Sequence, residues 1–197
     1  MGSKPKVAIV SPTGLIGSAI YDLFKDQYDL GLIYRNEDRL SLLFERFGEA
    51  ENYNKHQIEF NDLYQEYLKT FYGQKYGRQM GELVSFLKNY DWVINASGII
   101  KPFCDNIPDL AFFVNSALPN ILAQEFGSKL MQITTDCVFN GSHGAPYNET
   151  APKSPPDLYG LSKALGEPRE AIVLRCSTIG YELSGNRGLL ELLVSIY

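Results

Sequence analysis

A tyrosine and a lysine stand four residues apart in the stretch Tyr159-Gly160-Leu161-Ser162-Lys163. On a helix this spacing places both side chains on one face. A nearby ammonium stabilises a phenolate, so Lys163 is expected to lower the pKa of Tyr159 from about 10 toward working pH. A decrease of roughly three units needs about 4 kcal/mol of differential interaction, which one cation in a water-poor site can supply. The pair predicts proton donation to a carbonyl oxygen that receives a hydride. An exposed Tyr–Lys pair without a function is the alternative.

Hydroxyl groups follow an apolar run in the stretch Thr134-Thr135-Asp136. Ligands of open α/β sheets bind at the carboxyl ends of the strands. The Thr135 hydroxyl is therefore predicted to hydrogen-bond the substrate oxygen that Tyr159 protonates, and Asp136 is a second candidate for substrate contact. Turn and cap chemistry is the alternative for Asp136, and it is the favoured interpretation for Thr134.

A glycine-containing turn joins the first predicted strand to the first predicted helix in Ser11-Pro12-Thr13-Gly14-Leu15-Ile16-Gly17. A dinucleotide needs backbone close to its pyrophosphate and a helix N-terminus aimed at it. Gly14 permits that approach, and Gly17 is expected to let the helix pack close to the sheet. Ser11 stands where such loops carry a first glycine, so a positive φ there would strain the serine. An ordinary strand–helix turn is the alternative.

Arg35 closes the second predicted strand. An acidic residue at this point would bind the ribose 2′-hydroxyl of NAD, whereas an arginine suits the 2′-phosphate of NADP. Arg39 is placed to assist. The sequence thus favours NADP(H) over NAD(H), with a solvated strand-end arginine as the alternative.

Strand patterns alternate with helix patterns along the whole chain. The expected strands cover residues 7–10, 30–34, 57–60, 91–95, 129–134 and 171–175, and the expected helices cover 15–24, 40–47, 110–126, 155–165 and 189–196, with a helix–loop–helix over 62–90. This alternation predicts an α/β, Rossmann-like, doubly wound parallel sheet with flanking helices.

Composition excludes several classes of protein. The 197 residues carry a net charge of −5 without a basic cluster, which argues against nucleic-acid binding, and apolar runs are too short to span a bilayer. Cys104, Cys137 and Cys176 have no metal-ligand spacing, so no metal is expected and the thiols are predicted to be free. With no signal-peptide pattern at the start, a cytoplasmic location fits best.

The motifs together resemble one family. The stretch 134–141, followed by Pro146-Tyr147-Asn148-Glu149 and by Tyr159-Gly160-Leu161-Ser162-Lys163-Ala164-Leu165-Gly166-Glu167, resembles the dTDP-4-dehydrorhamnose reductase branch of the extended short-chain dehydrogenases. Asn95-Ala96-Ser97-Gly98, Val114-Asn115-Ser116-Ala117 and Arg175-Cys176-Ser177-Thr178 resemble further segments of that branch.

The resemblance implies roles for individual residues. Thr135, Tyr159 and Lys163 would be catalytic, and Ile133 and Thr178 would flank the nicotinamide. The residues that would line NAD(P), together with the loop members, are Ser11, Thr13, Gly14, Leu15, Ile16, Gly17, Arg35, Glu59, Phe60, Ala96, Ser97, Gly98, Tyr159 and Lys163. The expected substrate is a nucleotide-linked 4-keto-6-deoxy sugar, reduced with NAD(P)H.

The chain departs from the family in length. Residues 1–180 are expected to form the NAD(P)-binding domain, and 181–197 only the start of a substrate domain that is otherwise missing. A non-catalytic dinucleotide-binding subunit, or a truncated remnant of a reductase, is therefore the alternative function. The apolar pattern of Leu189, Leu190, Leu192, Leu193, Val194 and Ile196 predicts a homo-oligomer or a partner chain at the C-terminal helix.

Overall fold

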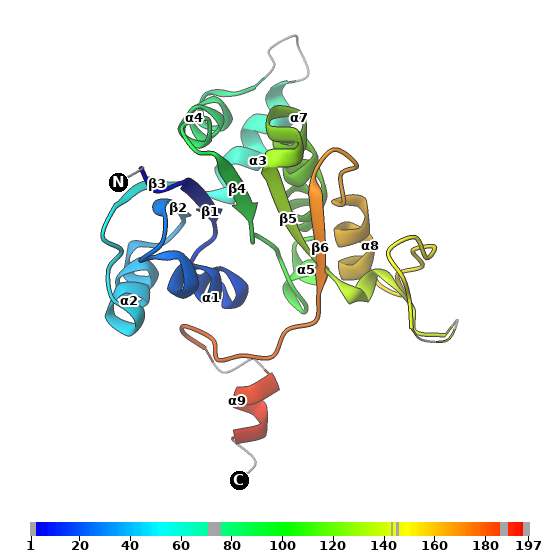
Figure 1. The fold of residues 1–197 in the computed structure, drawn as a ribbon. Coiled ribbons are helices and arrows are strands. Elements are labelled where there is room, and N and C mark those ends of the chain that lie inside the picture. The colour runs from blue at the N-terminus through cyan, green and yellow to red at the C-terminus, as the bar shows by residue number, and fades with distance from the viewer. Residues whose placement is uncertain (1–2, 71–75, 143, 145, 186–188, 195–197) are drawn as a thin grey trace. The chain divides into compact units, whose positions relative to one another are not determined.

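The computed structural model of the chain describes residues 3–70, 76–142, 144, 146–185 and 189–194 (Figure 1). The chain divides into two compact units, of which one comprises Met1–Ser97 with Thr178–Tyr197 and the other Gly98–Ser177. The domain boundary expected after residue 180 stays a prediction.

The first unit contains four parallel strands in the order β3-β2-β1-β4. These are β1 (Lys6–Val10), β2 (Asp29–Tyr34), β3 (Tyr53–Gln57) and β4 (Trp92–Asn95). Val7 is in register with Leu30 on one side and with Trp92 on the other. Residues 7–10 are buried, as expected of a central strand covered on both faces. Figure 1 shows α1 and α2 on one side of this sheet and α3 and α4 on the other.

Helices connect these strands: α1 (Leu15–Phe24), α2 (Glu37–Phe47), α3 (Phe60–Lys69) and α4 (Arg78–Leu87). The Asn36 side chain caps α2 by accepting the Arg39 N–H at 2.9 Å, and Gly48 ends this helix with a φ of 83°. The third strand was predicted wrongly at 57–60, because the structure places it at Tyr53–Gln57 and begins α3 at Phe60. This strand is mostly exposed, so it carries no apolar run that would reveal it.

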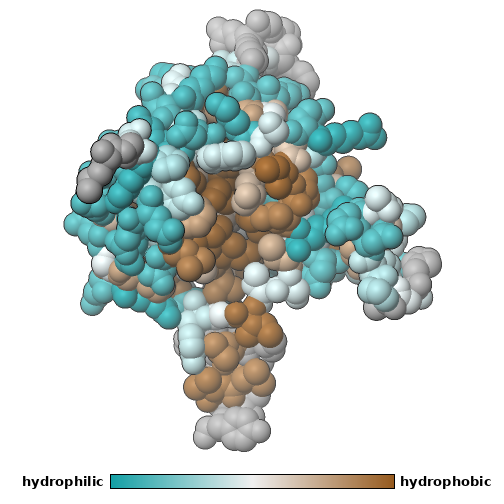
Figure 2. All heavy atoms as spheres, viewed as in Figure 1, coloured by the Kyte–Doolittle hydropathy of each residue, from teal (hydrophilic) through white to brown (hydrophobic). Residues whose placement is uncertain are grey.

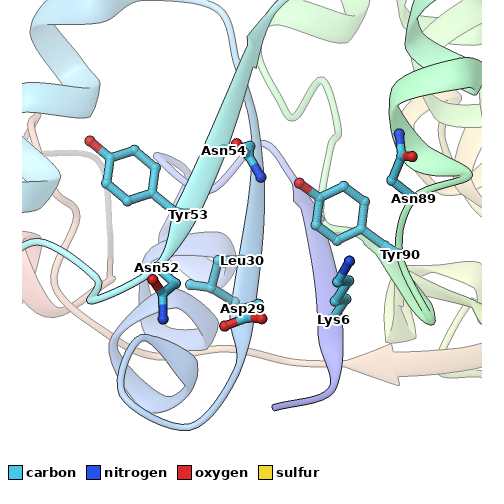
Figure 3. A pocket seen from close by; sticks show the side chains of 8 residues that line it. All are labelled: Lys6, Asp29, Leu30, Asn52, Tyr53, Asn54, Asn89 and Tyr90. Carbon is cyan, nitrogen blue, oxygen red and sulfur yellow. The ribbon is translucent and has the colours of Figure 1, made fainter. Parts of the chain in front are cut away.

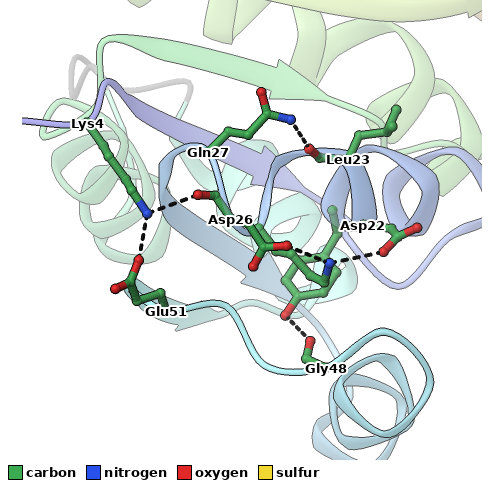
Figure 4. Close-up of polar contacts among 9 residues, drawn as sticks. Lys4, Asp22, Leu23, Asp26, Gln27, Gly48 and Glu51 are labelled. Carbon is green, nitrogen blue, oxygen red and sulfur yellow. Dashed lines mark hydrogen bonds and ion pairs between the residues drawn. The ribbon is translucent and has the colours of Figure 1, made fainter.

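Polar contacts hold the amino edge of this sheet to the end of α1 (Figure 4). The Lys4 ammonium donates to the Asp26 carbonyl at 3.0 Å and to the Glu51 carboxylate at 2.7 Å. The buried Tyr21 donates its phenol hydrogen to the Gly48 carbonyl at 2.7 Å. The start of β1, the end of α1 and the residues before β3 are therefore joined by contacts between segments far apart in sequence.

The second unit begins with a run of helices and continues into two strands. It contains α5 (Phe103–Asn106), α6 (Pro108–Phe112), the π-helix η2 (Phe113–Ala117), α7 (Leu118–Phe126), the 3-10 turn η3 (Gly127–Lys129), β5 (Leu130–Thr135), the 3-10 turn η4 (Asp136–Val138), α8 (Leu158–Leu165) and β6 (Ile172–Cys176). β5 and β6 are parallel, with Met131 beside Ile172. The helix expected over 110–126 is thus interrupted by a π-helical turn.

The start of α8 differs from the prediction. Its first residue is Leu158 and its N-cap is Asp157, whose Oδ1 accepts the Gly160 N–H at 2.8 Å. Pro155 and Pro156, the first two residues of the helix expected over 155–165, precede the helix. The capping carboxylate, and not the proline pair, therefore sets the residue at which the helix begins.

The six strands have the order β3-β2-β1-β4-β5-β6. This is the strand order of the Rossmann fold, so the predicted α/β class with a parallel sheet and flanking helices is confirmed. Over the part of the chain that the structure describes, no helix is both long and apolar enough to cross a membrane.

The last described element is α9 (Leu189–Val194). Figure 2 shows hydrophobic atoms gathered on the segment that carries it. Leu193 is 48% exposed and Val194 is 61% exposed. Ile196, which was expected to extend this apolar surface, lies outside the described residues.

Candidate active site

The loop after β1 has a strained first residue. Ser11 has a φ of 63°, the left-handed conformation that a glycine adopts freely. Its N–H donates to the Ile33 carbonyl at 2.8 Å, and its carbonyl accepts the Gly14 N–H at 3.2 Å. The positive φ considered for this position is present, and it costs a serine about 1–2 kcal/mol.

The glycines of this loop shape the start of α1. A Cβ on Gly17 would lie 2.0 Å from the Ser11 carbonyl oxygen, so any side chain would force the loop and helix apart. The close approach expected for Gly17 is therefore to the loop at the end of β1. Gly14 is the N-cap of α1 and offers no capping side chain. The first-turn N–H groups of α1 thus remain available to an anion, which fits the pyrophosphate of a dinucleotide.

Two arginines lie near this loop in the first unit. Arg35 follows β2 directly and is exposed, and its carbonyl accepts the Gln57 side-chain amide at 2.9 Å. Arg39, on α2, donates from Nη2 to the Thr13 carbonyl at 3.4 Å. Its Nε is buried and has no hydrogen-bond partner among the described residues. Arg39 thus contacts the Ser11–Gly17 loop itself, whereas Arg35 extends from the strand end.

Most of the remaining predicted cofactor residues of this unit lie at ends of strands or starts of helices. Glu59 is the exposed N-cap of α3, and Phe60 is its first residue. Ala96 donates its N–H to the Val10 carbonyl at 3.1 Å, which keeps the chain beside β1 past the end of β4. Thr178 is exposed. Leu15 and Ile16 form the first turn of α1.

A buried asparagine shapes the turn after β4. Asn95 is fully buried, and its Oδ1 accepts hydrogen bonds from the Ser97 N–H at 3.2 Å and from the Ser97 hydroxyl at 2.6 Å. Ser97 was predicted to line the cofactor, whereas Asn95 had no predicted role of its own. A polar residue at the end of an otherwise apolar strand was the signal available for it.

In the second unit the structure brings together Thr135, Tyr159 and Lys163. Thr135 ends β5 and is 6% exposed, and its side chain is hydrogen-bonded to the half-buried Tyr159 phenol. Lys163 is 6% exposed, one turn further along α8, and donates its ammonium hydrogen to the Ile133 carbonyl at 3.2 Å. An exposed Tyr–Lys pair, the alternative considered above, is therefore wrong.

The electrostatics of these groups differ from the sequence prediction. Burial raises the pKa of the Tyr159 phenol above its usual value, and the hydrogen bond with Thr135 lowers it by less. Burial also lowers the pKa of Lys163 to about 8. The expected decrease of the Tyr159 pKa is thus not found in this structure, because removing the phenol from water opposes its ionisation.

The capping role that the sequence indicated for Thr134 belongs to Thr135. Thr135, and not Thr134, is the capping residue, since its Oγ1 accepts the Cys137 N–H at 3.2 Å. Thr134 is buried in the strand, and its hydroxyl has no partner among the described residues. Asp136 is exposed, with its Oδ1 3.3 Å from the Thr135 hydroxyl.

The Asn115 side chain connects two segments of the second unit. Its Oδ1 accepts the Ile99 N–H at 2.9 Å, and its Nδ2 donates to the Ile99 carbonyl and to the Ser162 hydroxyl, each at 2.9 Å. A Cβ on Gly98 would lie 3.1 Å from the Lys163 ammonium and 3.4 Å from the Asn115 Oδ1. Asn115 therefore ties the Gly98 segment to α8, a role that a resemblance to a family helix did not reveal.

A hollow of about 390 Å³ lies at the amino ends of β1, β2 and β3 (Figure 3). Parallel strands place all amino ends at one edge, opposite the edge that carries Ser11 and Arg35. A Cβ on Gly31 would meet the Tyr90 ring at 2.3 Å, so this glycine makes room for the ring over β2. The hollow is thus separate from the Ser11–Gly17 loop. Its lining residues are Lys6, Asp29, Leu30, Asn52, Tyr53, Asn54, Asn89 and Tyr90.

Comparison with known proteins agrees with these features. A dTDP-4-dehydrorhamnose reductase from Streptomyces griseus is 46% identical over 63 residues, which are 30% of this chain and 21% of that protein. The dTDP-4-dehydrorhamnose reductase of Bacillus anthracis in complex with NADP has a TM-score of 0.62 and 19% identity, covering 98% of this chain and 59% of that one. The Bordetella bronchiseptica enzyme WbmG in complex with NAD has a TM-score of 0.65 and 16% identity, covering 88% and 53%.

This chain spans little more than half the length of these solved structures, whose low identities support the fold alone. The family match is more specific. The RmlD substrate binding domain matches residues 79–180, which is more than half of the 197-residue chain and includes Thr135, Tyr159 and Lys163. The chain therefore belongs to the RmlD substrate binding domain family, within the dTDP-4-dehydrorhamnose reductase-like branch of the short-chain dehydrogenases.

Proposed function

We propose that this chain is an NAD(P)H-dependent reductase of a nucleotide-linked 4-keto-6-deoxy sugar, of the dTDP-4-dehydrorhamnose reductase kind. The observation that carries the proposal is the Tyr159 phenol, hydrogen-bonded to Thr135 and followed one turn later by the buried Lys163. The similarity to a curated reductase over a quarter to a third of the chain supports the same substrate class.

Each side chain has a chemical task in this reaction. Because burial raises the pKa of Tyr159, the phenol stays protonated at neutral pH and has a proton to give to the sugar oxygen. Lys163, with a pKa of about 8, is mostly charged at pH 7 and opposes the negative charge that proton donation leaves on the phenol. The Thr135 hydroxyl orients the same sugar oxygen. A reduced nicotinamide, when bound, supplies the hydride.

The first unit offers the residues that would hold the dinucleotide. The pyrophosphate would lie at the α1 N-terminus, where Gly14 caps the helix without a side chain. We propose that Arg35 and Arg39 favour NADP(H) over NAD(H), because a guanidinium binds a 2′-phosphate in a bidentate manner. One solved structure similar to this chain holds NADP and another holds NAD, so these similarities favour neither cofactor. The proposed preference therefore depends on the two arginines.

A turnover assay tests the proposal. Wild-type protein is expected to oxidise NADPH in the presence of dTDP-4-keto-6-deoxyhexose, and Tyr159→Phe should lower the rate by about 10²–10⁴-fold. Dinucleotide affinity should stay nearly unchanged in this variant, because only a hydroxyl is removed. Tyr181→Phe, which alters a 55% exposed tyrosine, is the matched control. Tight dinucleotide binding without turnover would instead favour a non-catalytic binding subunit.

A further inference from the structure

An ion pair joins two distant segments of the second unit at the start of the helix that carries Tyr159. The Lys101 ammonium donates to Oδ2 of Asp157, 56 residues along the chain. The other carboxylate oxygen of Asp157 accepts the Gly160 N–H at 2.8 Å, and the Tyr159 N–H also hydrogen-bonds this carboxylate. Asp157 thus holds the first turn of α8 with one oxygen and Lys101 with the other.

The segment that carries Lys101 is itself fixed. Both backbone groups of Ile99 are hydrogen-bonded to the Asn115 side chain, as described above. The Cys104 N–H donates to the Ile100 carbonyl at 3.1 Å, and the Cys104 thiol contacts the Ile99 carbonyl at 2.9 Å. Hydrogen bonds therefore restrain the backbone before and after Lys101. This restraint limits the positions from which the Lys101 ammonium can bind Asp157.

The first turn of α8 has little freedom elsewhere. A Cβ on Gly160 would lie 2.3 Å from the Cys137 carbonyl oxygen, so this turn packs directly on η4. The Ser162 hydroxyl donates to the Tyr159 carbonyl at 2.8 Å and accepts from Asn115. The middle of α8 is thus tied to Asn115, and the Lys101–Asp157 pair is a second tie at its first turn.

We propose that Lys101 is a positioning residue, which holds the Asp157 carboxylate and thereby fixes the first turn of α8 and the Tyr159 hydroxyl. Its effect on turnover rests on the proposed function, whereas its effect on the helix start does not. Tyr159 is the second residue of α8, so fraying of this turn moves the phenol before it moves Lys163. Small displacements of a reacting group lower rates strongly.

Local order can be measured without turnover. In Lys101→Met, amide hydrogen exchange at Tyr159 and Gly160 should rise about 2- to 5-fold, the range expected for a partly exposed ion pair. Exchange at Leu122 in α7 should stay unchanged. The NMR resonance of the Tyr159 ring carbons, which is identified by its absence from the spectrum of Tyr159→Phe, should also shift in Lys101→Met. Lys101→Arg should restore both signals, and Lys129→Met, the same change at an exposed lysine of η3, should affect neither.

Variants of Asp157 separate its two contacts. Asp157→Asn keeps an oxygen for the Gly160 N–H and loses the ion pair, so it should match Lys101→Met, and the double variant should be no worse than either. Asp157→Ala also loses the cap and should raise exchange by a further ~5-fold. If the two single effects add in full, the side chains act separately and the proposal is overturned.

Turnover links the helix start to the chemistry. Lys101→Met should lower kcat about 3- to 10-fold and leave KM for the dinucleotide unchanged, since neither Lys163 nor the first unit is altered and Tyr159 keeps its side chain. Unchanged exchange and an unchanged Tyr159 resonance in Lys101→Met would overturn the inference, as would a uniform rise in exchange across the unit. If wild-type protein shows no turnover while exchange and resonance respond as expected, the proposed function fails and the positioning role stands.

Discussion

At the scale of single residues, the burial of Lys163 has a consequence for stability. Its pKa is about 8 in the folded chain and near the usual 10.5 in the unfolded chain. Between these values the unfolded state binds more protons, so the free energy of unfolding rises with pH. The burial penalty on the charged form is fully present below pH 8 and disappears above 10.5. The gain across this window is about 3 kcal/mol at most.

Lys163→Met should remove this dependence. Denaturation by urea at pH 7.5, 8.5 and 9.5 is expected to show wild-type protein gaining stability relative to the variant at each step. Tyr21, Tyr34 and Tyr53, each with a pKa raised to about 12, lower the stability of both proteins above pH 10, so the difference between proteins is the quantity to follow. A constant difference would mean that Lys163 titrates normally.

A second prediction at the scale of single residues concerns Arg35. Arg35→Ala should weaken NADPH binding by about 10- to 100-fold, the equivalent of one charged hydrogen-bonded contact. NADH binding should change little, because that cofactor has no 2′-phosphate. Fluorescence titration with both dinucleotides measures the effect, and Arg78→Ala, at an exposed arginine of α4, is the control. Equal losses for NADPH and NADH would refute a 2′-phosphate contact.

At the scale of elements, the packing of α8 on η2 depends on one glycine. A Cβ on Gly166 would lie 1.8 Å from the Asn115 carbonyl oxygen and 2.8 Å from its carbonyl carbon. Backbone atoms cannot move aside as a flexible side chain can, so Gly166→Ala should separate α8 from the π-helical turn. We expect a loss of about 1–3 kcal/mol in the free energy of unfolding.

Gly81 in α4 provides the matched control. A Cβ there has no atom within 4 Å, and the residue lies inside a helix. Gly81→Ala should therefore stabilise the protein by up to about 1 kcal/mol through helix propensity. Thermal unfolding of both variants checks the pair of predictions. A stable Gly166→Ala protein would mean that α8 can shift without cost.

At the scale of the whole molecule, the apolar surface of α9 predicts self-association. Leu193 and Val194 are exposed, and contiguous apolar surface favours contact between molecules. The apparent mass in sedimentation should rise with protein concentration, and Leu193→Glu with Val194→Lys should reduce the rise. Leu23→Glu changes an apolar residue of α1 that is 65% exposed and serves as the control. A concentration-independent monomer in wild type would contradict this prediction.

The sequence by itself determined the order of the elements and identified the residues whose side chains could take part in a reaction. Apolar runs predicted β1, β2, β4 and β5 because these strands are mostly buried and need apolar side chains. β6 also carries an apolar run, although Ile172 and Leu174 are each 39% exposed. The spacing of Tyr159 and Lys163 needed only helix geometry, and the loop from Ser11 to Gly17 needed only its position between strand and helix. Local sequence patterns are enough to predict these features because each of them depends on residues that are close together along the chain.

The tertiary structure alone decided features that depend on distant neighbours. It placed β3 at Tyr53–Gln57, where an exposed strand lacks a hydrophobic signal. It brought Ile99 and Ser162 within hydrogen-bonding distance of the Asn115 side-chain amide. It also paired Lys101 with Asp157. It also raised the pKa of Tyr159 where sequence reasoning expected a decrease, because the extent of burial is set by packing and cannot be read from spacing.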